Sequence, residues 1–210
     1  GGSEEYWMNR LADAMVPYLN ASGIQYVRNT PEMTAASSIL ASNSGNFDLH
    51  LALHSTGVPE GQYGQIRGVL VFYYPGSAEG RRAAEIVAEN LKKIYPLPSK
   101  VRTEPTTTIG EVRKVRAPSV FLELGYHDNP DDAAWVQNNL DAIARNLVES
   151  LCQYFGIPFL EPRPARQAVV DVEWGALNIR SRPDRSAPIV ARAYDGARLT
   201  VLNQWQGWYL

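Results

Sequence analysis

The chain has 210 residues, which suits one α/β domain of ordinary size and a small appended domain. Its formal net charge of −2 leaves neither sign in excess, so the composition gives no reason to expect nucleic acid or an anionic membrane as a partner. No apolar run approaches the roughly 20 residues of a membrane span. The single cysteine, Cys152, lies in an apolar stretch and is best interpreted as a buried structural thiol.

Helical and strand patterns alternate along the first three quarters of the chain. Ser3 can cap a helix whose first turn is acidic, as the helix dipole favours. The predicted helices cover about 4–19, 34–43, 79–94 and 130–155, and the predicted strands cover 24–28, 49–54, 68–74 and 119–125. This alternation predicts an α/β fold with a mostly parallel sheet covered by helices on both faces.

The composition changes near residue 158. Residues 158–167 hold three prolines and are predicted to form a semi-rigid linker. Residues 168–210 contain short β-type runs broken by Gly and Pro, which predict a small, partial all-β barrel. We therefore expect a domain over 1–157, a linker over 158–167 and a second domain over 168–210.

The chain has three histidines, of which His54 stands at the end of an apolar strand pattern and directly before Ser55-Thr-Gly57. In an open α/β sheet, ligands gather beyond the carboxyl ends of the strands, so His54 is as plausible a ligand as a structural residue. His50 lies on the same side of that strand but roughly 13 Å away, so the two cannot bind one metal ion. We interpret His50 as structural.

Three glutamates complete the set of candidates. Glu123 interrupts the apolar run Val120-Phe-Leu-Glu-Leu124, where an unpaired carboxylate is costly. It could pair with Arg113 or Arg116, or it could act as a general base with a raised pKa. Glu4 and Glu5 would ordinarily be solvated residues at a helix start. One Glu, one His and a second Glu at strand and helix ends would nevertheless suit a hydrolytic zinc site.

Three segments resemble the zinc-dependent N-acetylmuramoyl-L-alanine amidases of bacterial autolysins and phage lysins. They are Ser3-Glu-Glu-Tyr-Trp-Met-Asn-Arg-Leu-Ala-Asp13, Asp48-Leu-His-Leu-Ala-Leu-His-Ser55 and Ser119-Val-Phe-Leu-Glu-Leu-Gly-Tyr-His-Asp-Asn129, and they occur in the family's order. The resemblance implies Glu4 and His54 as zinc ligands and Glu123 as the catalytic acid/base. Glu4 is preferred to Glu5 because it places the following helix on the family's positions without a gap. His127 falls on a variable position and is expected to be structural.

The chain departs from the family's pattern in the residues before Ser3. The family carries a strand and a further zinc ligand, usually His, before the glutamate, whereas Gly1-Gly2 precedes Ser3 here. We therefore expect a catalytic domain without its N-terminal strand, weak metal binding, and an inactive fragment as one open outcome. Leu177-Asn-Ile-Arg-Ser-Arg-Pro183 and Gly207-Trp-Tyr-Leu210 resemble a bacterial Src-homology-3-like wall-binding domain, which would be incomplete.

The resemblance implies a monomeric enzyme that binds peptidoglycan outside the cell or in the wall, or in the cytoplasm before release if it is a phage lysin. The expected reaction is hydrolysis of the amide bond between N-acetylmuramic acid and L-alanine, with zinc as cofactor. Two alternatives stay open at this point. One is a zinc peptidase that cuts within the stem peptide, and the other is a non-catalytic module that only binds the wall.

Overall fold

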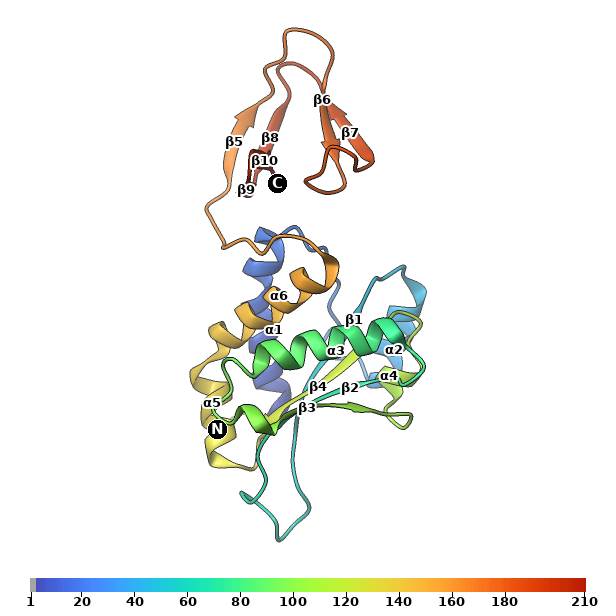
Figure 1. The fold of residues 1–210 in the computed structure, drawn as a ribbon, viewed down its shortest axis with the longest axis vertical. Coiled ribbons are helices and arrows are strands. Elements are labelled where there is room, and N and C mark those ends of the chain that lie inside the picture. Colours follow the sequence, from blue (N-terminus) through green and yellow to red (C-terminus); the bar gives the residue numbers. More distant parts are fainter. Residues whose placement is uncertain (1–2) are drawn as a thin grey trace.

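The computed structural model describes residues 3–210, which form an α/β body and a smaller β-rich region beyond one end of it (Figure 1). The helices of the body are α1 (Glu4–Ala21), α2 (Ala35–Ser44), α3 (Ala78–Leu91), the 3-10 helix η1 (Pro98–Lys100), α4 (Gly110–Arg113), α5 (Pro130–Asn138) and α6 (Leu140–Phe155). Its strands are β1 (His50–Thr56), β2 (Val69–Tyr73), β3 (Val101–Pro105) and β4 (Ser119–Tyr126).

The four strands form one mixed sheet in the order β1-β4-β2-β3. The pairs β1–β4 and β2–β3 are parallel, as the alternating pattern predicted, whereas β2 runs antiparallel to β4. The α/β class and the central sheet flanked by helices are confirmed. The parallel pairing of β1 and β4 matters most for function, because it brings the carboxyl ends of both strands to the same edge of the sheet.

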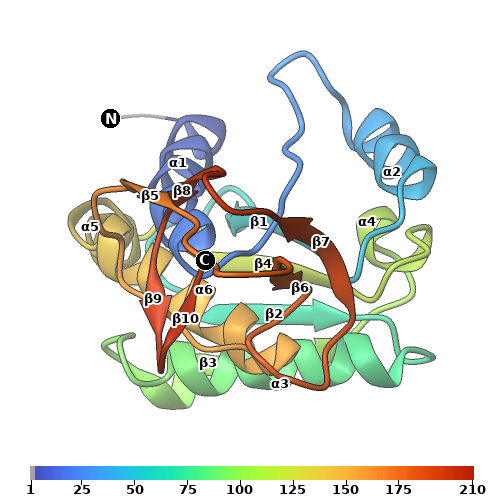
Figure 2. The same cartoon turned by 90° about the horizontal axis from the view of Figure 1, so that it is seen from above.

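The two faces of the sheet differ in how they are covered. On one face, alternate residues of β4 (Val120, Leu122 and Leu124) are fully buried in the main apolar core with α1, α3 and α6. On the other face, Phe121 packs in a much smaller cluster with Val112 of α4. Figure 2 shows α2 and α4 together at one end of the sheet. The second face is thus only partly covered, which leaves room for a site on it.

One predicted helix is in fact two. The pattern over 130–155 predicted a continuous helix, but α5 ends at Asn138 and α6 begins at Leu140. Asn139 between them leaves helical geometry, and its side-chain amide donates to the carbonyl of Trp135 at 2.7 Å. Asn competes for backbone hydrogen bonds in this way, so one side chain ends the first helix.

The strand predicted over 24–28 does not form. Residues 24–30 follow α1 without regular structure, and within residues 3–210 the sheet pairs β1 only with β4 on one side. A β-type sequence becomes a strand only when a neighbour accepts its hydrogen bonds, and no described strand lies beside this segment.

Asp132 of α5 connects the segment just before β2 to the end of β4 through hydrogen bonds. It is fully buried and accepts hydrogen bonds from the Arg67 guanidinium, the Gly68 amide, the Tyr95 hydroxyl and the Tyr126 amide. The loop after β1 and the end of β4 are therefore fixed to one carboxylate. Removing one partner from such a buried, fully hydrogen-bonded charge strongly destabilises a fold.

We expect Asp132→Ala to lower the free energy of unfolding by roughly 3–5 kcal/mol, because four donors lose their acceptor in the interior. Asp131→Ala is the matched control, since its side chain is 71% exposed and makes only a surface ion pair with Arg67. That control is expected to cost less than about 1 kcal/mol. Urea denaturation of both variants measures the difference, and equal midpoints would contradict the assignment.

The C-terminal region consists of short antiparallel strand pairs. Its strands are β5 (Arg166–Val169), β6 (Leu177–Arg180), β7 (Ile189–Ala193), β8 (Arg198–Val201), β9 (Gln204–Trp205) and β10 (Trp208–Tyr209), paired as β5–β8, β6–β7 and β9–β10. Buried Asn203 joins this region to the body, donating to the carbonyls of Ala21 and Glu161 at 3.2 and 2.9 Å. The region therefore meets the C-terminal end of α1, the end opposite to Glu4. The domain limits at 157 and 167 stay predictions.

Candidate active site

The site begins where β1 and β4 end side by side. His54 of β1 is the register partner of Glu123 of β4, so both side chains leave the sheet on the same face. Immediately afterwards β4 contains one extra residue, because Thr56 pairs with Tyr126. Gly125 within this bulge has φ +81°, a conformation that favours glycine. The irregularity ends regular pairing directly beyond the two candidate residues.

Glu4 reaches this edge from the first turn of α1. Ser3 caps the helix by accepting from the Tyr6 amide, and the carboxylate of Glu4 then extends toward β1. Its Oε1 lies 3.0 Å from His54 Nδ1 and accepts from the Ser55 amide at 3.0 Å. The hydrogen bond with His54 lowers the pKa of Glu4. Glu5 is exposed, so the structure brings Glu4 rather than Glu5 to His54.

Glu123 is largely enclosed, and one of its oxygens is left without a partner. Among residues 3–210, Glu123 Oε2 is buried with no hydrogen bond, and no ion pair joins Glu123 to Arg113 or Arg116. The pairing with an arginine, left open by the sequence, is therefore absent from the described residues. Burial raises the pKa of Glu123 to about 7, the charge of His54 opposes this rise, and the charge of Glu4 adds to it. A carboxyl with a pKa near neutrality can both take and give a proton.

Glu111 is a fourth residue of the site that the sequence did not reveal. It projects from α4, its side chain is 13% exposed, and its Oε2 lies 3.3 Å from His54 Nε2. Its Oε1 lies 3.8 Å from His50 Nε2. The imidazoles of His50 and then His54 lower the pKa of Glu111 to about 2. An acidic residue in a segment where the sequence predicts no helix or strand has no signal that separates it from a solvated one.

The His54 imidazole is held on three sides. It stacks on the Phe121 ring with centroids 4.2 Å apart and planes at 14°, while Glu4 and Glu111 contact its two nitrogens. Burial lowers the pKa of His54, but the hydrogen bonds with Glu111 and Glu4 outweigh this effect and raise it to about 9. The ring is thus fixed in orientation, with its Nδ1 directed to Glu4.

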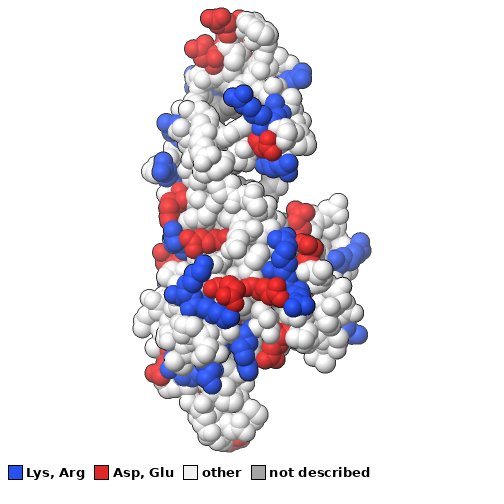
Figure 3. Space-filling model, in the orientation of Figure 1, with Lys and Arg blue, Asp and Glu red and all other residues white. Residues whose placement is uncertain are grey.

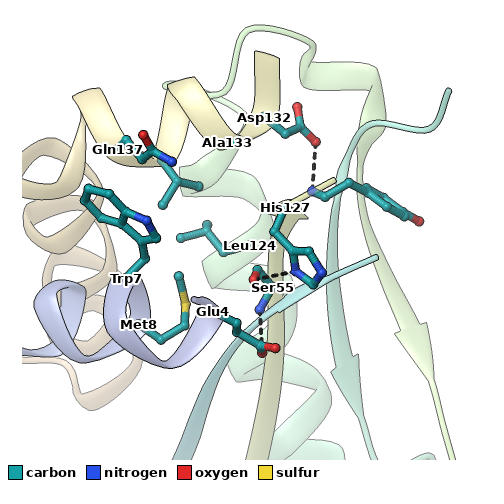
Figure 4. Close-up of a pocket in the computed structure, with 11 residues that line it drawn as sticks. Glu4, Trp7, Met8, Ser55, Leu124, His127, Asp132, Ala133 and Gln137 are labelled. Atoms are coloured by element: carbon teal, nitrogen blue, oxygen red, sulfur yellow. Dashed lines mark hydrogen bonds between the residues drawn. The ribbon is translucent and has the colours of Figure 1, made fainter. Parts of the chain in front are cut away.

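The other two histidines make contacts of the kind expected for structural residues. His50 Nδ1 lies 3.1 Å from Ser42 Oγ on α2, and His127 Nδ1 lies 3.0 Å from Ser55 Oγ. His127 lines a small cavity of about 50 Å³ beside Glu4, between α1, α5 and the sheet (Figure 4). This space holds a few water molecules at most, so a large substrate would have to approach from the open face of the sheet.

The donors at this edge match the chemistry of zinc. Zinc prefers imidazole nitrogen and carboxylate oxygen, which are the atoms that Glu4 and His54 bring to within 3.0 Å of each other. The unpartnered oxygen of Glu123 adds a buried acceptor nearby. Within residues 3–210, no group of three or more His, Cys, Asp or Glu side chains is placed to hold a metal ion. The described residues therefore offer two ligands.

Charged side chains of both signs are mixed on one face of the molecule (Figure 3). On the face shown in Figure 3, Lys and Arg alternate with Asp and Glu, and neither sign gathers into one patch. In the part of the chain that the structure describes, no helix is both long and apolar enough to span a bilayer.

Solved amidases share the fold of the body. They include the N-acetylmuramoyl-L-alanine amidases AmiC2 of Nostoc punctiforme (17% identity, TM-score 0.62, covering 73% of this chain and 84% of that chain) and Ami1 of Mycobacterium smegmatis (18%, 0.64, 74% and 78%). The catalytic domain of CwlV from Bacillus (Paenibacillus) polymyxa var. colistinus is similar at 13% identity, with a TM-score of 0.64 and coverage of 75% and 87%. A comparison with curated protein sequences gave no significant match.

Sequence families identify both parts of the chain. Residues 1–153 match the family described as N-acetylmuramoyl-L-alanine amidase, and residues 175–210 match the bacterial SH3 domain. The first match covers well over half of the 210 residues. The chain therefore belongs to the N-acetylmuramoyl-L-alanine amidase family, whose reaction is hydrolysis of an amide bond in peptidoglycan, and it carries a bacterial SH3 domain at its C-terminal end.

Proposed function

We propose that this amidase uses zinc held by Glu4 and His54, with Glu123 as the acid/base, to cleave the bond between N-acetylmuramic acid and L-alanine. The observation that carries the proposal is the 3.0 Å approach of Glu4 Oε1 to His54 Nδ1, beside a buried carboxylate oxygen of Glu123 that has no partner. Two ligands hold zinc less firmly than three, so we expect this chain to bind zinc weakly.

When bound, zinc would supply Lewis acidity to the scissile carbonyl and to a water molecule. Residues of the chain carry out the proton transfers and hold the two proposed ligands in position. Glu123, with a pKa of about 7, takes a proton from the attacking water and returns it to the nitrogen of the leaving L-alanine. The stacked Phe121 ring and the Ser55 amide keep His54 and Glu4 in place during this exchange.

The SH3 domain is proposed to bind the cell wall, which places the enzyme in the wall or outside the cell. It contacts the C-terminal end of α1, whereas Glu4 lies at the N-terminal end of the same 18-residue helix. A helix of that length spans about 27 Å. Wall binding and hydrolysis would therefore take place at separate points of the peptidoglycan. We propose that the chain acts as a monomer.

The test is digestion of purified peptidoglycan with the chain, with added zinc and with a chelator. We expect new L-alanine amino termini with zinc, loss of activity with chelator, and recovery when zinc is restored. Mass spectrometry should show stem peptides that begin with L-alanine and glycans that keep the lactyl group. Cuts within the stem would indicate a peptidase instead. Wall binding without release of any product would indicate a binding module.

A further inference from the structure

Glu111 is a charged residue at the site that the proposed reaction does not use. Its carboxylate is nearly enclosed, and it approaches two histidines that stand four residues apart on β1. Glu111 Oε2 lies within hydrogen-bond distance of His54 Nε2, at 3.3 Å. Its Oε1 lies 3.8 Å from His50 Nε2, which is too far for a hydrogen bond and leaves that buried nitrogen without a partner among residues 3–210.

The position of Glu111 is fixed by the packing of α4. Val112, the next residue, is buried in the small apolar cluster with Phe121. The carbonyl of Glu111 accepts from Ser119 Oγ at 2.6 Å, which ties α4 to the first residue of β4. The carboxylate therefore stands on a backbone anchored at two points to the strand that carries Glu123.

Glu4 and Glu111 contact opposite nitrogens of the His54 ring. Glu4 lies at Nδ1 and Glu111 at Nε2, so one metal ion cannot sit between His54 and both carboxylates. The charge of Glu4 contributes to the raised pKa of Glu123. Glu4 Oε1 is also fixed by the Ser55 amide at 3.0 Å, so the Nδ1 side is where His54 and a second anchored ligand atom meet.

We propose that Glu111 is a positioning residue that accepts the Nε2–H of His54 and so directs Nδ1 at the metal position shared with Glu4. This inference rests on the proposed zinc function. A carboxylate behind a metal-binding imidazole fixes which nitrogen carries the proton and makes the other nitrogen a better ligand. His50, whose Nδ1 lies 3.1 Å from Ser42 Oγ on α2, flanks the Glu111 carboxylate at 3.8 Å.

The test compares Glu111→Ala and Glu111→Gln with wild type. Zinc affinity, measured by competition with a chromophoric chelator, is expected to fall about 10–100-fold in Glu111→Ala. It should fall less in Glu111→Gln, whose amide oxygen can still accept the Nε2–H. Arg113→Gln, on the exposed side of the same helix, is the matched control and should leave zinc affinity unchanged. Thermal denaturation checks that every variant is folded.

Nitrogen-15 NMR of the His54 ring gives a readout that a general loss of stability would not move. In zinc-bound wild type we expect the metal at Nδ1 and a proton at Nε2. In the metal-free protein, the hydrogen-bonded Nε2–H signal should be present in wild type and absent in Glu111→Ala. Metal at Nε2, or variants with unchanged affinity and unchanged ring shifts, would overturn the assignment of Glu111. Wild type that binds no zinc but shows the Nε2–H difference would refute the zinc function, leaving only the contact between Glu111 and His54.

Discussion

Glu123→Gln is expected to lower the rate of amide hydrolysis by about 10²–10⁴-fold while zinc affinity stays within a few-fold of wild type. The amide of Gln has nearly the shape of the carboxyl group, but it cannot take a proton from water. Because Glu123 is proposed as the acid/base and not as a zinc ligand, the substitution should lower the rate of hydrolysis without lowering the affinity for zinc. Initial rates on purified peptidoglycan at saturating zinc, together with a chelator competition, measure both quantities. Full activity in the variant would refute the proposed role.

The same substitution should stabilise the metal-free fold at alkaline pH. The folded pKa of Glu123 is about 7, above the ordinary value of 4.5, because burial disfavours the charged form. Its contribution to stability is therefore fully present below pH 4.5 and is lost as pH rises through 7. Glu123→Gln should match wild type near pH 4.5 and exceed it at pH 8, by on the order of 1 kcal/mol after solvent screening.

Urea denaturation at the two pH values checks this expectation. Glu85→Gln on α3 is a suitable control, because its carboxylate is 48% exposed and pairs only with Arg81 on the surface. That substitution removes only a surface ion pair and should cost less than about 1 kcal/mol at either pH. A Glu123→Gln variant that is less stable than wild type at pH 8 would mean that the carboxylate is needed for folding. A gain in stability with loss of activity is what a buried catalytic charge predicts.

The sequence singled out three of the four residues that lie together at this edge of the sheet. His54 ends a strand pattern, Glu4 begins a helix pattern and Glu123 breaks an apolar run, so each stands where periodicity and polarity conflict. The structure brings all three to one edge, although their chemical roles stay predictions. Glu111 could not be found in this way, because it interrupts no helix or strand that the sequence predicts, and His54 lies 57 residues away along the chain.

The parts of the fold that the sequence did not reveal depend on contacts between distant segments. β3 contains a single buried residue, Val101, so it has no apolar alternation to identify it. The antiparallel direction of β2 beside β4 is a choice of topology that strand patterns do not encode. The break between α5 and α6 depends on one side chain, Asn139, within an otherwise continuous helical pattern.

Glu4→Gln and Glu5→Gln form a matched pair that tests the metal ligand, because the two residues are adjacent in the first turn of α1 and differ only in what they contact. Glu4 Oε1 faces His54 Nδ1 at 3.0 Å, whereas Glu5 is exposed. Each loses the same favourable interaction with the helix dipole, worth about 0.3–1 kcal/mol, and Glu4→Gln also loses its negative charge beside His54, so it should be the less stable variant.

The affinity for zinc should differ sharply between Glu4→Gln and Glu5→Gln. A lost ligand costs at least the roughly 10–100-fold that a lost supporting residue costs, so Glu4→Gln should bind zinc far more weakly, while Glu5→Gln should bind like wild type. Activity at limiting zinc should follow affinity. The reverse ranking would assign the ligand to Glu5. Equal affinities would remove the zinc site from α1 altogether and, because Glu4 is the only carboxylate found at His54 Nδ1 within residues 3–210, would leave His54 without a partner ligand there.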